Sequence, residues 1–278
     1  MGKPTDFRTG KSAKNIKKTK PKAQEIILVE KEELALEREK FMTLGEHLEE
    51  LRQRIIRILI TLGGTTTLAL FFASDIHKFF AQPYKNVLGE NANFYQIKVM
   101  APLLMYLQTS FMIAILVTFP VLLYLLWGFI APAVDEKTEK SGKLLILFST
   151  VLFWAGLALC YFTVFESMLK VFLVALRPPD IETKLPIDEY YDLFFNVHLI
   201  FGLAFQLPVV LILLGRIGIL SSNFLIKRWR EAVVIISIFS AVLSPGPDVF
   251  SMMMLFVPLT FLFGFSLVIM KILEKRDT

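Results

Sequence analysis

Apolar runs long enough to cross a lipid bilayer dominate this chain of 278 residues. A membrane-spanning helix needs about 20 mostly apolar residues, because the hydrocarbon core is about 30 Å thick and every backbone amide must be paired within the helix. Together with 55% hydrophobic residues, the runs predict an integral membrane protein. The predicted long spans are Ile55–Ala73, Leu103–Ile130, Leu144–Phe165, Leu193–Leu214 and Phe250–Met270.

A shorter apolar run, Ala232–Leu243, lies between the last two long ones. As a helix it would extend about 18 Å, which is well short of the hydrocarbon thickness. The sequence therefore predicts an all-α, polytopic membrane protein with six transmembrane helices, of which the fifth is short. The bilayer would thin around this short span, or the segment would be re-entrant.

Basic residues set the orientation of these spans. Most of the 30 lysines and arginines fall in the N-terminal tail, the even-numbered loops and the C-terminus. The positive-inside rule then places both termini in the cytoplasm. We also expect no cleaved signal peptide, because the first apolar run begins only at Ile55. The basic residues assigned to the two long odd-numbered loops are Lys78, Lys85, Lys98, Lys170, Arg177 and Lys184.

The distribution of polar residues divides the chain into three parts. Residues 1–41 form a polar, partly disordered cytoplasmic tail, whose lysine-rich beginning would be attracted to anionic lipid head groups. Residues 42–273 form the six-span core, and residues 274–278 form a short cytoplasmic C-terminus.

A dense cluster of charge, GEHLEELRQR, directly precedes the first span. On a helix, Glu50 lies four residues before Arg54 and Glu49 three before Arg52, so that each pair meets on successive turns. One interpretation is a solvated interfacial helix whose charges pair with one another. The other is a recognition site at the membrane edge, and the residues by themselves leave both open.

Several motifs in a fixed order resemble the TatC family, the multi-span core of the twin-arginine protein translocase. HLEELRQR, His47–Arg54, resembles the motif that precedes the family's first span, and Pro83 follows in the first outer loop. The resemblance covers about Met42 to Lys271. The later motifs are PVLLYLLWGFIAPAV from Pro120, FQLPVV from Phe205 and SPGPDVFS from Ser244.

The resemblance implies a function. It implies the receptor and core of a translocase in the bacterial cytoplasmic (inner) membrane, which recognises twin-arginine signal peptides and exports folded proteins using the proton gradient. The implied partners are single-span proteins of the TatA and TatB types, folded cargo and membrane lipids, with several copies in a larger complex. No enzyme activity, cofactor, metal or nucleic-acid partner is implied.

The resemblance also implies where the signal binds. Glu50 would form a charge-assisted fork with a guanidinium of the signal, and His47, Arg52 and Arg54 belong to the same motif. The family places a second glutamate in the first cytoplasmic loop, at a position that falls on Thr138 here. Glu139 is the nearest acid and Glu136 the alternative; we expect Glu139, close to the start of the next helix, to take the role.

Other polar and helix-breaking residues give further candidates. Gln206 and Pro208 occupy the fourth span, where family members often carry glutamate at the place of Gln206; both would contact a partner helix or the inserted signal. The alternative for Gln206 is an ordinary hydrogen bond between helices. We further expect His198 to serve packing, Pro120 and Pro258 to interrupt their helices, and Gly202 and Gly264 to allow close helix contacts. Candidates for structural or gating roles are Pro83, Phe129, Pro132 and Asp248.

Two rival functions remain to be weighed. A small-solute secondary transporter would place ionisable residues near the bilayer midplane, where this chain has little beyond Gln206 and His198. An intramembrane aspartyl protease would need an aspartate pair, and Asp192 with Asp248 is the nearest candidate. Zinc-protease, serine-hydrolase and phosphate-loop motifs do not occur in the sequence.

Overall fold

A computed structural model describes residues 44–130, 142–180, 183–244, 246 and 248–277, with side chains described from Glu49 to Glu274. The chain forms two compact units, Met1–Gln53 and Arg54–Thr278. The predicted boundary between tail and core, at residue 41, lies outside the described residues and stays a prediction.

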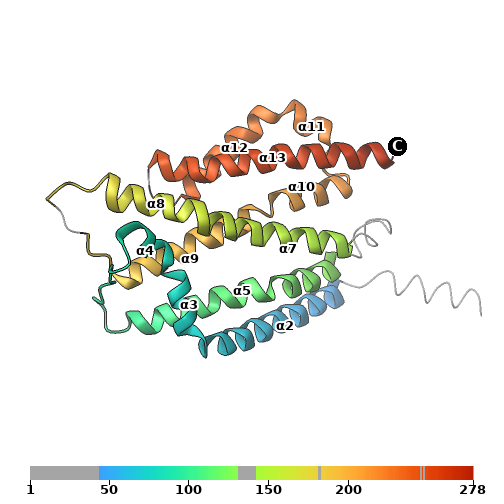
Figure 1. The fold of residues 1–278 in the computed structure, drawn as a ribbon. Helices are drawn as coiled ribbons and strands as arrows, with labels where there is room; N and C mark the ends of the chain where they lie inside the picture. Colours follow the sequence, from blue (N-terminus) through green and yellow to red (C-terminus); the bar gives the residue numbers. More distant parts are fainter. Residues whose placement is uncertain (1–43, 131–141, 181–182, 245, 247, 278) are drawn as a thin grey trace, which may run out of the picture. The chain divides into compact units, whose positions relative to one another are not determined.

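The described residues fold into helices, as predicted, and their only strand-like pairing is an isolated bridge between Tyr95 and Pro186. In Figure 1 the helices of the second unit run side by side and are joined at their ends by loops and short helices. The elements in chain order are α2 (Leu44–Leu70), α3 (Ala73–Phe80), α4 (Gln82–Leu88), α5 (Ala101–Ile130), α7 (Gly142–Leu159), η2 (Cys160–Phe165), α8 (Glu166–Lys170), η3 (Val171–Ala175), α9 (Ile187–Ala204), α10 (Leu207–Arg216), α11 (Ser222–Lys227), α12 (Trp229–Leu243) and α13 (Val249–Asp277).

In the described part of the chain, four helices are long and apolar enough to cross a membrane: Ala101–Phe129, Gly142–Ala175, Ile187–Arg216 and Val249–Glu274. The helix pair Glu49–Leu70 and Ala73–Leu88 makes a fifth if it counts as one span bent by 85°. The short fifth span predicted from the sequence corresponds to α12, whose 15 residues extend about 22 Å.

Most span boundaries differ from the prediction, and those of the first and third spans have a clear cause. Helix α2 begins at Leu44 rather than Ile55, because the charged motif continues the same helix, and it ends at Leu70 instead of Ala73. The third span continues beyond Phe165 through α8 to Ala175, by way of the π-helical turns η2 and η3. The charged residues Glu166 and Lys170 of this extension pair with each other at 2.7 Å, which lets the helix carry them.

The prediction that Pro120 and Pro258 interrupt their helices is wrong, since α5 and α13 run through them. A proline leaves the carbonyl four residues earlier without its helical donor. At Pro120 this carbonyl belongs to Leu116, and the indole Nε1 of Trp154 on α7 donates to it at 3.1 Å. A neighbouring helix thus replaces the missing hydrogen bond.

The closest helix packing joins α7 to α9 through two glycines. A Cβ at Gly156 would lie 2.9 Å from the backbone oxygen of Phe201, and one at Gly202 would lie 2.5 Å from the ring of Phe153. Phe153 also stacks on Phe119 of α5, with ring centroids 3.7 Å apart. The predicted close contact at Gly202 is therefore confirmed, whereas the one at Gly264 is wrong, because nothing lies within 4 Å of a Cβ there.

The outer end of the bundle is closed by the short helices α3 and α4. The hydroxyl of buried Tyr190 donates to the Phe80 carbonyl at 2.7 Å, which ties α9 to α3. In the first outer loop, Lys98 pairs with Asp188 at 2.6 Å, and this hydrogen bond raises the pKa of Lys98 above its ordinary value.

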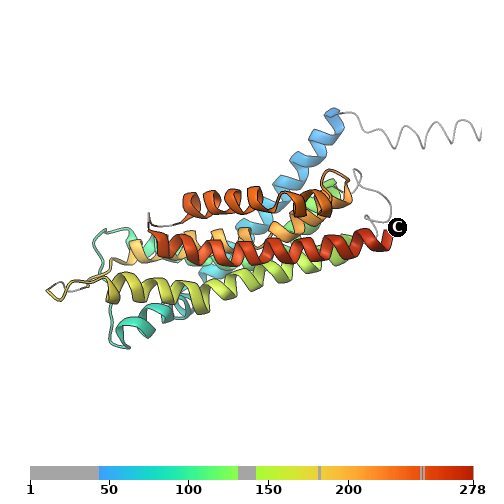
Figure 2. The same ribbon diagram turned by 90° about the horizontal axis from the view of Figure 1, so that it is seen from above.

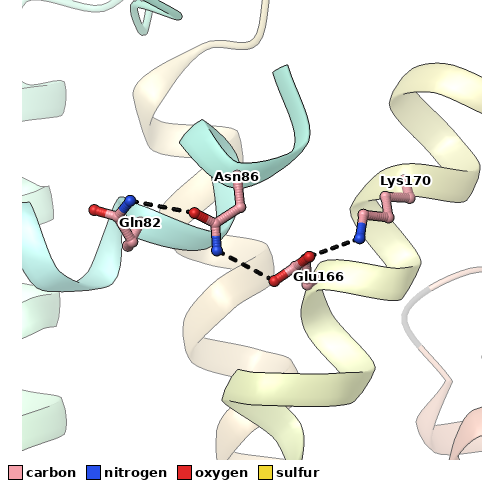
Figure 3. Close-up of polar contacts among 4 residues, drawn as sticks. All are labelled: Gln82, Asn86, Glu166 and Lys170. Atoms are coloured by element: carbon pink, nitrogen blue, oxygen red, sulfur yellow. Dashed lines mark hydrogen bonds and ion pairs between the residues drawn. The ribbon is translucent and has the colours of Figure 1, made fainter. Parts of the chain in front are cut away.

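A chain of polar side chains attaches α4 to the third span (Figure 3). Gln82 donates to Asn86 at 3.2 Å, and the Asn86 amide donates to Glu166 at 3.3 Å. Lys170 holds the other oxygen of Glu166 at 2.7 Å. Pro83, at the start of α4, is buried.

The opposite end of the second unit carries basic residues of the even-numbered loops and helix ends. It gathers the C-terminal ends of α5, α10 and α13 with the N-terminal end of α7 and the short helix α11 (Figures 1 and 2). Lys143 lies in the first turn of α7, Arg216 ends α10 and Lys227 ends α11. This end therefore faces the cytoplasm.

Candidate functional site

The predicted signal-binding motif forms the first turns of α2. The predicted pair of Glu49 and Arg52 is confirmed, with Nη1 of Arg52 3.3 Å from Glu49, and both side chains are exposed. Glu50 is half-buried and has contacts of its own. His47 lies in the helix, but its side chain is outside those described.

Arg54 does not point into solvent. Its Nη1 donates to the Leu125 carbonyl at 2.6 Å. This carbonyl lies near the C-terminal end of α5, where the helix dipole also stabilises a positive charge. A Cβ at residue 128 would lie 2.1 Å from this nitrogen, so Gly128 leaves the space for the guanidinium. Arg54 thus fastens the start of the first span to the end of the second.

A second close contact lies at the base of the first cytoplasmic loop. A Cβ at Gly142, in the first turn of α7, would lie 2.0 Å from the indole Nε1 of Trp127 on α5. Phe129, half-buried, lies two residues after this tryptophan and has contacts of its own. The loop residues Pro132, Glu136 and Glu139 lie outside the described residues, and their predicted roles stay predictions.

Gln206 lies in the turn between α9 and α10, two residues before the buried Pro208. Its amide oxygen accepts from the hydroxyl of Ser149 on α7, and its Nε2 donates to the Ser149 carbonyl at 3.2 Å. The side chain thus makes the interhelical hydrogen bond that was the alternative to a contact with a partner. The interhelical bond does not exclude a contact with a partner, since the amide nitrogen of Gln206 retains one further hydrogen to donate.

The remaining polar candidates act locally. Asp248 caps α13 by accepting from the Ser251 backbone nitrogen at 2.8 Å, while its other carboxylate oxygen is buried with no partner in the described part of the chain. His198 is buried, stacks on Phe194 with centroids 3.9 Å apart and bonds to the Phe194 carbonyl, as a packing role requires.

The aspartate pair of a protease does not form. Asp192 accepts from Gln108 at 2.5 Å on α5, whereas Asp248 serves its own helix. Within the described residues no three histidine, cysteine, aspartate or glutamate side chains gather to hold a metal. These findings leave the hydrogen-bonded, charged cytoplasmic ends of the helices as the candidate site.

Sequence reasoning missed Ser149, Gly142 and the carbonyl of Leu125 as partners of the candidate residues. A serine in the third span and a glycine beside Lys143 give no signal of their own. Their importance can be recognised only when the facing residue is known, because Ser149 bonds to Gln206 and Gly142 leaves space for Trp127.

The family model described as Sec-independent protein translocase protein (TatC) matches residues 46–258. The chain belongs to the TatC family. The match begins at Glu46, within the charged motif, and it includes the three later motifs at least in part.

Curated relatives in the TatC family cover most of this chain. The Sec-independent protein translocase protein TatC of Haemophilus influenzae is 30% identical over 83% of this chain and 90% of its own length. TatCy of Bacillus subtilis is 32% identical over 84% of this chain and 91% of its own length. These bacterial relatives and the apolar helices identify a multi-pass protein of the cytoplasmic membrane.

A solved structure agrees in fold. A crystal structure of the twin arginine translocase receptor TatC superimposes with a TM-score of 0.68 at 28% identity, over 82% of this chain and 99% of that one. The TatC family is a family of translocase components and not of enzymes, which rules out the protease and transporter alternatives for this chain.

Proposed function

We propose that this TatC chain is the receptor and core of a translocase that recognises twin-arginine signal peptides and exports folded proteins at the expense of the proton gradient. The family match, which begins at Glu46 and contains the whole HLEELRQR motif, carries the proposal. That motif supplies carboxylates at the membrane edge, and a carboxylate binds a guanidinium through two parallel hydrogen bonds.

Within the motif, the acids and bases take different roles. Glu50 would bind one arginine of the signal, with His47 nearby and Arg52 balancing the charge of Glu49. Arg54 is engaged by the Leu125 carbonyl, so we assign it the positioning of α2 rather than a direct contact with the cationic signal.

Glu139 would supply the second carboxylate, and comparison with Glu136 tests this. In Glu139→Gln, a photoreactive twin-arginine signal peptide should crosslink to membranes no better than a twin-lysine control. In Glu136→Gln, the preference for arginine should survive, because we expect Glu136 to be a turn residue that does not contact the signal. Loss of discrimination in Glu136→Gln alone would mean that the wrong acid was chosen, and equal crosslinking of both peptides to the unchanged protein would refute the receptor function.

The chain is a component of a translocase, and we propose that its other subunits are single-span proteins of the TatA and TatB types. Gln206 and Pro208 would meet one of them or the inserted signal, because the half-buried amide in the turn between α9 and α10 retains one donor beyond its bonds to Ser149. We further propose that Pro132 and Phe129 shape the first cytoplasmic loop, that Pro83 and Asp248 shape the outer end, and that several copies assemble in the complex.

The pair of Gln206 and Ser149 allows a prediction. Gln206→Ala should weaken crosslinks to a partner or to the inserted signal more than it weakens binding of the signal at the surface. Ser149→Ala, the matched variant, removes the interhelical bond but keeps the amide, at a stability cost of about 0.6 kcal/mol. If Gln206→Ala and Ser149→Ala reduce crosslinking and surface binding of the signal to the same extent, Gln206 serves only the packing of the helices.

A further inference from the structure

The first and second spans enclose an apolar groove. In the second unit, α2 and α5 line it with Ile58, Thr61 and Leu62 on one side and Ile115, Thr118 and Leu122 on the other, with Val121 at its edge. The space measures about 320 Å³, including its open side. Both helices lie along the lower edge of the bundle in Figure 1.

The walls of the groove offer no free polar group. The hydroxyl of Thr61 donates to the Arg57 carbonyl at 2.8 Å, and that of Thr118 donates to the Ala114 carbonyl at 2.6 Å. A groove lined in this way favours an apolar occupant, because its two hydroxyl groups have already used their donors and water would find few hydrogen-bond partners in it.

The cytoplasmic end of the groove is cationic. On α2, Arg54 lies one turn before Ile58 and Arg57 one turn before Thr61, so both arginines share the face that lines the groove. Arg54 is held by the Leu125 carbonyl. Arg57 is exposed and makes no ion pair in the part of the chain that the structure describes.

We infer that this groove binds an anionic glycerophospholipid of the inner leaflet. One acyl chain lies between α2 and α5, and the phosphate lies against Arg57, with the positive charge of Arg54 nearby. The inner leaflet carries the anionic lipids that basic residues at a span end attract. The site shares Arg54 with the proposed signal-binding motif but uses neither of its carboxylates, Glu49 and Glu50.

Size and charge exclude the other occupants. The lining residues of α5 run from Ile115 to Leu122, about 10 Å along the helix, whereas a helix with its side chains is about 10–12 Å across. The groove is therefore too short to enclose a partner helix, which could contact it only with single side chains. A signal that carries adjacent arginines would be repelled by the two arginines at the mouth, and a phosphate is attracted by them.

The test uses the full chain in phosphatidylcholine nanodiscs that contain a trace of phosphatidylglycerol with a photoreactive acyl chain. Crosslinks should map to α2 and α5 and exceed those of a photoreactive phosphatidylcholine. Arg57→Gln should reduce them about fivefold, the loss expected for one basic residue at an anionic surface. A photoreactive phosphatidylglycerol with short, water-soluble chains should not label, because it fills too little of the groove.

Two valines one turn apart on α5 provide a matched control. Val121 lies at the groove and is 43% exposed, and Val117 lies outside it and is 53% exposed. Val121→Trp should block lipid labelling, whereas Val117→Trp should not. Equal labelling of the two variants, equal labelling by both long-chain lipids, or capture of a photoreactive signal peptide in the groove instead of lipid would overturn the inference.

Discussion

Replacing Glu50 with alanine is expected to abolish export of a twin-arginine cargo while membrane abundance stays near normal. Opposite charges about 4 Å apart attract by about 4 kcal/mol at an effective dielectric of about 20, before desolvation is subtracted. An interfacial carboxylate contributes little to folding, so the loss should fall on recognition. Export is measured as the fraction of cargo that reaches the outer side of the membrane.

Glu49→Ala is the control, because Glu49 is exposed and pairs with Arg52 at 3.3 Å. It removes the same charge one residue away and should leave most export intact. Normal export in Glu50→Ala would show that this carboxylate does not bind the signal, and equal loss in both variants would indicate a general effect of charge at the membrane edge.

Gly156→Leu is expected to cause the largest loss of stability. A side chain there meets the Phe201 backbone oxygen at 2.9 Å and Cγ of Phe205 at 2.7 Å, and a backbone atom cannot move aside as a flexible side chain can. Overpacking of this kind typically costs about 1–3 kcal/mol. The thermal unfolding midpoint in detergent and the amount of protein in the membrane should both fall.

Gly264→Leu is the matched variant, since no atom lies within 4 Å of a Cβ at that position. Its unfolding midpoint should stay close to that of the unchanged protein. A midpoint of Gly156→Leu equal to that of Gly264→Leu would mean that α7 and α9 separate easily, contrary to the packing described.

The spans could be predicted because the bilayer imposes a length and an apolar composition that a sequence displays directly. The ends of the spans could not be predicted, because where a helix ends depends on hydrogen-bond partners that lie in other parts of the chain. The third span extends past Phe165 since Lys170 and Asn86 bind Glu166, and α5 continues through Pro120 since Trp154 supplies the missing donor. These partners lie on other helices or outside the predicted span.

The candidate site follows the same pattern. The pairing of Glu49 with Arg52 could be predicted, because residues three apart meet on any helix. The partner of Arg54 could not, since Leu125 is 71 residues away and contributes a backbone carbonyl, which every residue type possesses. Family resemblance identified which residues matter, and only the three-dimensional contacts indicate that Arg54 positions the helix.

Helix α12 has a consequence for assembly. Its 15 residues extend about 22 Å, about 8 Å less than the hydrocarbon core, and relieving the mismatch costs a fraction of a kcal/mol per Å. A spanning helix of this length would require the lipids along its side of the protein to compress, and the elastic energy would grow with the length of the compressed boundary. Two molecules that met along their α12 sides would share one compressed zone, so the elasticity of the membrane would favour this arrangement without any specific contact between side chains.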